Sequence, residues 1–66
     1  MSEVQVQKLV QVAAQFGVQL KVAGTRIIKI NHQDAELDAA TYMPDQMIEL
    51  IMKIVGVQMQ AAYIRA

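Results

Sequence analysis

Three acidic residues and one histidine in the middle of this chain have the side chains best suited to chemistry. Asp34, Glu36 and Asp38 have the spacing that begins a calcium-binding loop. No glycine follows at the sixth loop position and no glutamate at the twelfth, so the pattern predicts a solvated acidic loop and no metal site. His32 has no serine, cysteine or acid at a catalytic spacing, which predicts a loop histidine and no catalytic residue.

The cations gather in the first half of the chain, where Lys8, Lys21, Arg26 and Lys29 are four of the six. Five of the six anions follow residue 30, and the net charge is zero. The clustered cations Lys21, Arg26 and Lys29 have no aromatic platform beside them, so nucleic acid is not expected as a partner. Two explanations remain open: a basic hairpin that attracts an acidic peptide, or charge complementarity within the fold.

The size and composition favour association. With 66 residues, the chain is expected to form one small interaction domain over residues 1–66, and such a chain buries only about 60% of its unfolded surface. Cysteine is absent and one histidine is present, so neither disulfides, metal nor another cofactor is expected. Hydrophobic residues are 55% of the chain, which predicts apolar surface that a partner could cover. The expected function is therefore interaction, and not that of an enzyme.

No signal peptide is visible in the glutamine-rich N-terminal segment. The longest apolar stretch, residues 47–57, is interrupted by Glu49 and Lys53 and is too short to span a bilayer. We therefore expect a cytoplasmic protein without a membrane partner.

The clustered cations belong to a β-hairpin predicted over residues 17–30, where apolar and polar side chains alternate about Gly24. With a loop of Ala23, Gly24 and Thr25, Lys21, Lys29 and Ile27 would share the more polar face. A two-stranded ribbon is marginal in water and needs helices over its apolar face. That apolar face would hold Val18, Leu20, Val22, Ile28 and Ile30.

The first covering helix is predicted between an N-cap at Ser2 and a stop at Gly17. Its end should bring Phe16 near Val18 and Ile30. The apolar stripe that would face the hairpin consists of Val6, Leu9, Val10, Ala13 and Phe16.

Residues 31–34 have the composition of a turn, and residues 35–41 could form either a short third strand or an irregular crossing. Of these two alternatives, we favour the irregular crossing. The second helix begins at Pro44 and is apolar around most of its circumference. Gly56 could either mark a close crossing in one long helix or divide the segment into two helices.

The order of helix, Gly-Val-x-Leu-x-Val-x-Gly-x-Arg-Ile hairpin, loop and Pro-Asp helix resembles the N-terminal docking domains of nonribosomal peptide synthetase subunits of the tubulysin (TubC) type. The resemblance covers roughly residues 4–55. Before the second helix the family usually has Leu-Thr-Pro-Glu, where this chain has Tyr-Met-Pro-Asp. The matching residues are Gly17, Val18, Leu20, Val22, Gly24, Arg26, Ile27 or Ile28, Pro44, Asp45, Met47 and the run 48–53.

The resemblance implies an αββαα module that binds the acidic C-terminal tail of an upstream subunit as an extra strand, and so orders the subunits. The second hairpin strand, residues 26–31, would receive the tail, and Arg26 and Lys29 would meet its acids. The binding residues would be Lys21, Arg26, Ile27, Ile28, Lys29 and Ile30.

The sequence thus predicts an α+β domain with a helix, a β-hairpin and one long or two short helices, acting as a non-catalytic docking module. The alternative is a small free-standing protein of phage or plasmid type. It would form a homodimer through the residue 47–64 helix and regulate another protein.

Overall fold

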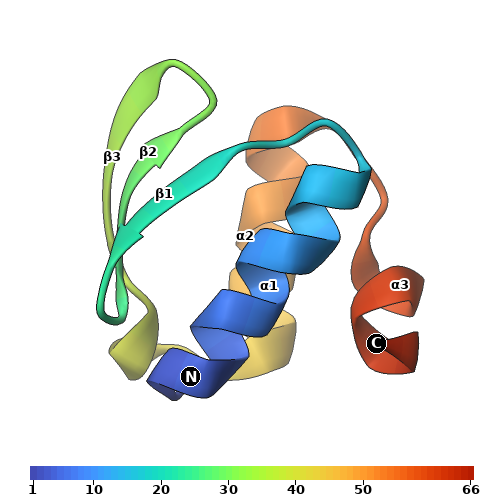
Figure 1. Cartoon of the computed structure of the whole chain (residues 1–66), viewed down its shortest axis with the longest axis horizontal. Helices are drawn as coiled ribbons and strands as arrows, with labels where there is room; N and C mark the ends of the chain where they lie inside the picture. Colours follow the sequence, from blue (N-terminus) through green and yellow to red (C-terminus); the bar gives the residue numbers. More distant parts are fainter.

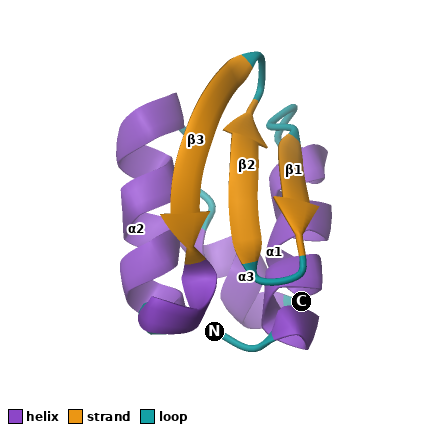
Figure 2. Ribbon diagram, turned by 90° about the vertical axis from the view of Figure 1, so that its left-hand side faces the viewer, coloured by secondary structure: helices purple, strands orange, loops and turns teal.

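A three-stranded antiparallel sheet carries the helices of this chain on one face only (Figures 1 and 2). The computed structural model describes all 66 residues. Helices α1 and α2 lie against the sheet, and α3 packs on α1 and α2. The predicted α+β class, with a helix, a hairpin and two further helices, is confirmed. In order, the elements are α1 (Glu3–Gln15), β1 (Leu20–Ala23), β2 (Arg26–Ile30), β3 (Gln33–Asp38), a 3-10 turn (Ala39–Thr41), α2 (Pro44–Val55) and α3 (Gln60–Arg65).

Helix α1 begins as its sequence predicts. The Ser2 hydroxyl accepts from the Gln5 N–H at 3.2 Å, and the Gln5 side chain accepts from the Ser2 N–H at 2.8 Å, which forms a capping box. The helix ends before Gly17, whose φ of +76° suits glycine. Phe16 was expected to pack against the hairpin near Val18 and Ile30, and this prediction is wrong because Phe16 is 41% exposed. Val12, which was not in the predicted stripe, is buried in the core instead.

The β1–β2 hairpin exists, but its register differs from the predicted one. Its loop has two residues, Gly24 and Thr25, so Ala23 faces Arg26 and Val22 faces Ile27. One extra residue of β2, Ile28, then forms a bulge before the pairing resumes with Lys21 and Lys29. The bulge turns Ile27 into the core and leaves Ile28 outside it, which reverses their predicted places.

The expected irregular crossing after residue 34 is wrong: Gln33–Asp38 forms strand β3, antiparallel to β2. A tight turn at Asn31 and His32 reverses the chain, with Asn31 at a φ of +56°. Ala35 and Leu37 point inward and pack against the core, while their neighbours are exposed. The strand exists because β2 supplies its pairing partner and the acidic side chains can remain in water.

Gly56 divides the last segment into two helices. Its φ is +70°, and its N–H donates to the Met52 carbonyl at 2.7 Å, closing α2 with a left-handed cap. The chain then folds back, and Met59 and Tyr63 become buried. Residues 47–64 are therefore not one helix, and the predicted dimer surface along such a helix does not exist. None of the three helices combines the length and the apolar character needed to cross a membrane.

The hydrophobic core fills the space between the sheet and the helices. Its largest fully buried side chains come from α1, the central strand, α2 and the segment before α3. Burial of these side chains provides the main stabilisation of so small a fold. They are Val6, Leu9, Val12, Ile27, Met47, Ile48, Ile51 and Met59.

Candidate functional site: the open face and free edges of the sheet

The outer face of the sheet is open, and Figure 2 shows no element in front of it. Cross-strand partners share a face, so the register places Lys29 beside Asp34 and Arg26 beside Asp38. The Lys29 ammonium lies 3.9 Å from the Asp34 carboxylate. Cations on β2 therefore face acids on β3, and charge complementarity within the fold accounts for part of the charge segregation in the sequence.

The six residues predicted to bind a partner peptide do not form one exposed surface. Ile27 and Ile30 are only 0% and 4% exposed and belong to the core. Ile28 is half-buried on the outer face. Only the three charged residues are exposed: Lys21, Arg26 and Lys29.

The predicted acceptor strand is also unavailable. Strand β2 lies in the centre of the sheet, with β1 on one side and β3 on the other. Every residue of β2 except the bulged Ile28 has a partner on both neighbouring strands, so a peptide could join β2 only by displacing β1 or β3. The sequence predicts no strand over residues 33–38, and a two-stranded hairpin would leave β2 with a free edge.

Two edges remain free, one on β1 and one on β3. On β3, Gln33 and Leu37 face β2, and the β2–β3 register shifts between these two pairs. Strand β3 itself keeps its alternation, since Ala35 and Leu37 are half-buried and Asp34 and Glu36 exposed. The backbone groups of Asp34 and Glu36 therefore point away from the sheet. The same alternation on β1 directs the backbone groups of Leu20 and Val22 outward. Each edge therefore offers an unpaired row of donors and acceptors to another strand.

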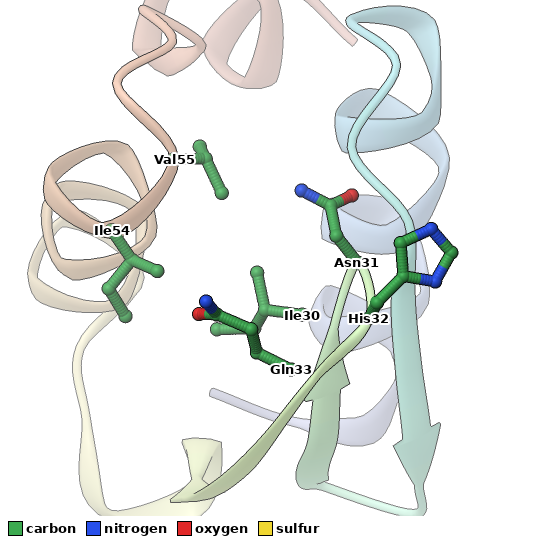
Figure 3. A pocket seen from close by; sticks show the side chains of 6 residues that line it. All are labelled: Ile30, Asn31, His32, Gln33, Ile54 and Val55. Carbon is green, nitrogen blue, oxygen red and sulfur yellow. The ribbon is translucent and has the colours of Figure 1, made fainter.

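An apolar strip of α2 borders the β3 edge. Ile54 is 47% exposed and helps to line a hollow of about 350 Å³ between α2 and the β2–β3 turn (Figure 3). Leu50, one helical turn earlier, is half-buried, lies outside the core and lines a second hollow with Tyr42 and Lys53. Figure 2 shows α2 projecting past β3. Leu50 and Ile54, one turn apart on this helix and not fully buried, are together the apolar strip of α2.

The β1 edge lies beside a different helix surface. Helix α1, which packs against β1, has a mostly polar exposed surface with glutamines at Gln7, Gln11 and Gln15. The exposed large apolar side chains of this helix are Val4 near its start and Phe16 at its end. The two edges therefore differ in the side chains that they offer to a partner.

The acids and the histidine singled out in the sequence have separate roles. Asp38 accepts from the Ala40 N–H at 3.0 Å and from the Thr25 hydroxyl at 3.2 Å, so it caps the 3-10 turn. Asp34 pairs with Lys29, whereas Glu36 has neither an ion pair nor a hydrogen bond. His32 is exposed in the β2–β3 turn and borders the larger hollow. Nowhere do three histidine or acidic side chains come close enough to hold a metal ion.

Comparison of the chain with models of protein families, with characterised proteins and with solved structures finds no match.

Proposed function

We propose that this chain is a non-catalytic docking domain that takes up an extended segment of a partner protein as an additional strand of its sheet. The observation that carries the proposal is a small sheet with two free edges and an open outer face on a helical support. In such β-augmentation, backbone hydrogen bonds provide affinity and the alternating side chains provide selectivity. A fourth strand would also extend a sheet whose present strands have only four to six residues.

In the setting that the synthetase resemblance suggests, the partner is the C-terminal tail of an upstream megasynthase subunit in the cytoplasm, and docking orders the subunits for nonribosomal peptide synthesis. An acidic tail would add to β1, because β2 has no free side. Lys21 is the exposed cation on that edge strand.

Hydrogen exchange with a ¹⁵N-labelled sample tests the docking function. The sample is titrated with acetylated and amidated eight-residue peptides of alternating polar and valine residues, and with synthetase tail peptides. A bound strand should slow exchange at the outward amides of one edge, either Asp34 and Glu36 or Leu20 and Val22. No protection at either edge with any peptide would contradict the proposal.

Two proline variants provide a matched control. Because the N–H groups of Glu36 and Val22 point away from the sheet, proline at either position removes no hydrogen bond within it. Glu36→Pro should block strand addition at β3 only, and Val22→Pro at β1 only. Equal peptide affinity in the wild type and both variants would place binding away from the sheet edges and overturn β-augmentation.

A further inference from the structure

We infer that the partner strand adds to β3 and is basic on one face and apolar on the other. This inference rests on the proposed docking function, the addition of a strand to a free sheet edge. It assigns that strand to β3 and gives it a charge opposite to that of the acidic tail considered for β1. It depends on three features of the β3 edge: the outward backbone groups, the apolar strip on α2 and the acidic side chains of the strand.

The backbone defines where a strand can pair. The outward groups of Asp34 and Glu36 have no partner within the chain. The Asp38 carbonyl instead accepts from the Thr41 hydroxyl at 2.8 Å, which closes that end of the edge. The open segment of β3 is therefore residues 33–37.

The inner face of an added strand would be apolar. Side chains that point inward from the new strand would lie beside Ala35 and Leu37, which already pack against the core. Because α2 projects past β3 in Figure 2, an added strand would also lie beside this helix, which carries the apolar strip Leu50 and Ile54. Removing this apolar surface from water favours binding by about 25 cal/mol per Å².

The outer face of the added strand would be basic. In antiparallel pairs, residues opposite each other have their Cβ atoms about 4.5–5.5 Å apart. The positions opposite Asp34 and Glu36 would therefore lie beside carboxylates. Glu36 has no cation of its own, and the side chain of Asp34 is 91% exposed, so both acids can accept a lysine or arginine of the partner.

A second copy of this chain fits the edge poorly. Antiparallel pairing of two β3 strands about a two-fold axis would place Asp34 or Glu36 directly opposite an acid of the other copy. Like charges in opposite positions destabilise a strand pair. The acids therefore select against self-association and in favour of a basic partner.

Two probe peptides test the inference, one alternating valine with lysine and the other alternating valine with glutamate. The lysine peptide should bind the wild type more tightly and protect the amides of Asp34 and Glu36. In the variant Asp34→Lys with Glu36→Lys, affinity for the lysine peptide should fall about tenfold or more, since two attractive pairs become repulsive. The variant Glu3→Lys with Asp45→Lys has the same net charge, changes exposed acids that line neither hollow, and should bind as the wild type does.

A second pair of variants tests the apolar strip without changing charge. Ile54→Ser should weaken binding of the lysine peptide severalfold because Ile54 would contact its inward side chains. Ile64→Ser, at an isoleucine on α3 that is 68% exposed, should leave the affinity unchanged. Equal effects of the two substitutions would overturn the role assigned to α2.

The outcomes separate the inference from the docking function. Preference for the glutamate peptide, with protection at Leu20 and Val22, would overturn the inference and retain docking at β1. Equal affinity for both peptides would overturn the assigned partner chemistry. Absence of edge protection with either peptide would overturn the docking function, and the inference with it.

Discussion

At the scale of single residues, the bulge in β2 decides which of two adjacent isoleucines stabilises the fold. Ile27 is 0% exposed, whereas Ile28 lies outside the core on the open face. Strict alternation from a three-residue loop predicts the opposite arrangement. The two-residue loop and the bulge together shift the faces, and neither feature has a distinctive side-chain pattern in the sequence.

Ile27→Val and Ile28→Val should therefore differ in stability. Removing one methyl group from the fully buried Ile27 should lower the free energy of unfolding by about 0.5–1.5 kcal/mol. Ile28→Val should change it by less than about 0.5 kcal/mol, as is usual for substitutions outside the core. Urea denaturation followed by circular dichroism measures both values. A larger loss for Ile28→Val would support the register predicted from the sequence.

The phenol of Tyr63 gives a pH-dependent prediction. Burial raises its pKa above the ordinary value of 10.0. Because the unfolded chain loses this proton first, the folded state is favoured fully below about pH 10 and progressively less above it. Tyr63→Phe should therefore reduce the loss of stability between about pH 9 and pH 11. Phenylalanine keeps the ring over which the Lys8 ammonium lies, 4.4 Å from the centroid.

Urea midpoints of the wild type and Tyr63→Phe across that pH range measure the effect. Tyr42→Phe is the control, since it removes the other tyrosine of the chain. If the urea midpoints of both variants fall with pH as steeply as that of the wild type, burial of the Tyr63 phenol does not contribute to the loss of stability at high pH.

At the scale of elements, Gly56 determines whether the C-terminal segment is one helix or two. The left-handed φ of +70° is strained for a residue with a Cβ. A Cβ at this position would meet no other atom within 4 Å, so the penalty is purely conformational.

Gly56→Ala should therefore destabilise the protein by about 1–2 kcal/mol. Gly56→Asn should cost less, because asparagine tolerates the left-handed region. In a continuous helix the same alanine would stabilise by about 1 kcal/mol, so the sign of the change distinguishes the two structures. Thermal unfolding monitored by circular dichroism gives that sign.

The elements that could be predicted from the sequence are those with local signals. Ser2 begins α1 and Pro44 begins α2 as expected, because caps and first-turn prolines act within a few residues. Strand β3 lacks such a signal, since small and acidic residues have low strand propensity. It forms through pairing with β2, which a single sequence does not reveal. For this reason β2 was wrongly predicted to accept the partner strand. The sequence likewise identifies Arg26 and Lys29 as exposed cations but does not reveal that they lie opposite Asp38 and Asp34.

At the scale of the whole molecule, the sheet is covered on one side and exposed on the other, with two open edges. An exposed edge strand can pair with a strand of another chain and so cause aggregation, and charged side chains on the edge commonly prevent this. The acids of β3 can therefore limit self-association while they select a basic partner. Both effects have the same origin, the placement of carboxylates on the outer side of an edge strand whose inner side is apolar.

Replacing these carboxylates should therefore make the protein associate with itself. In the variant Asp34→Val with Glu36→Val, repulsion between two β3 strands is removed and valine favours strand pairing. Sedimentation velocity from micromolar to millimolar concentration should show a monomeric wild type and a concentration-dependent increase for the variant. The variant Glu3→Val with Glu49→Val removes two acids from the helices and should sediment as the wild type does. If removal of the β3 acids leaves the protein monomeric, these acids do not restrain pairing. If both double variants associate alike, the effect follows from net charge and hydrophobicity, and the edge has no special part in it.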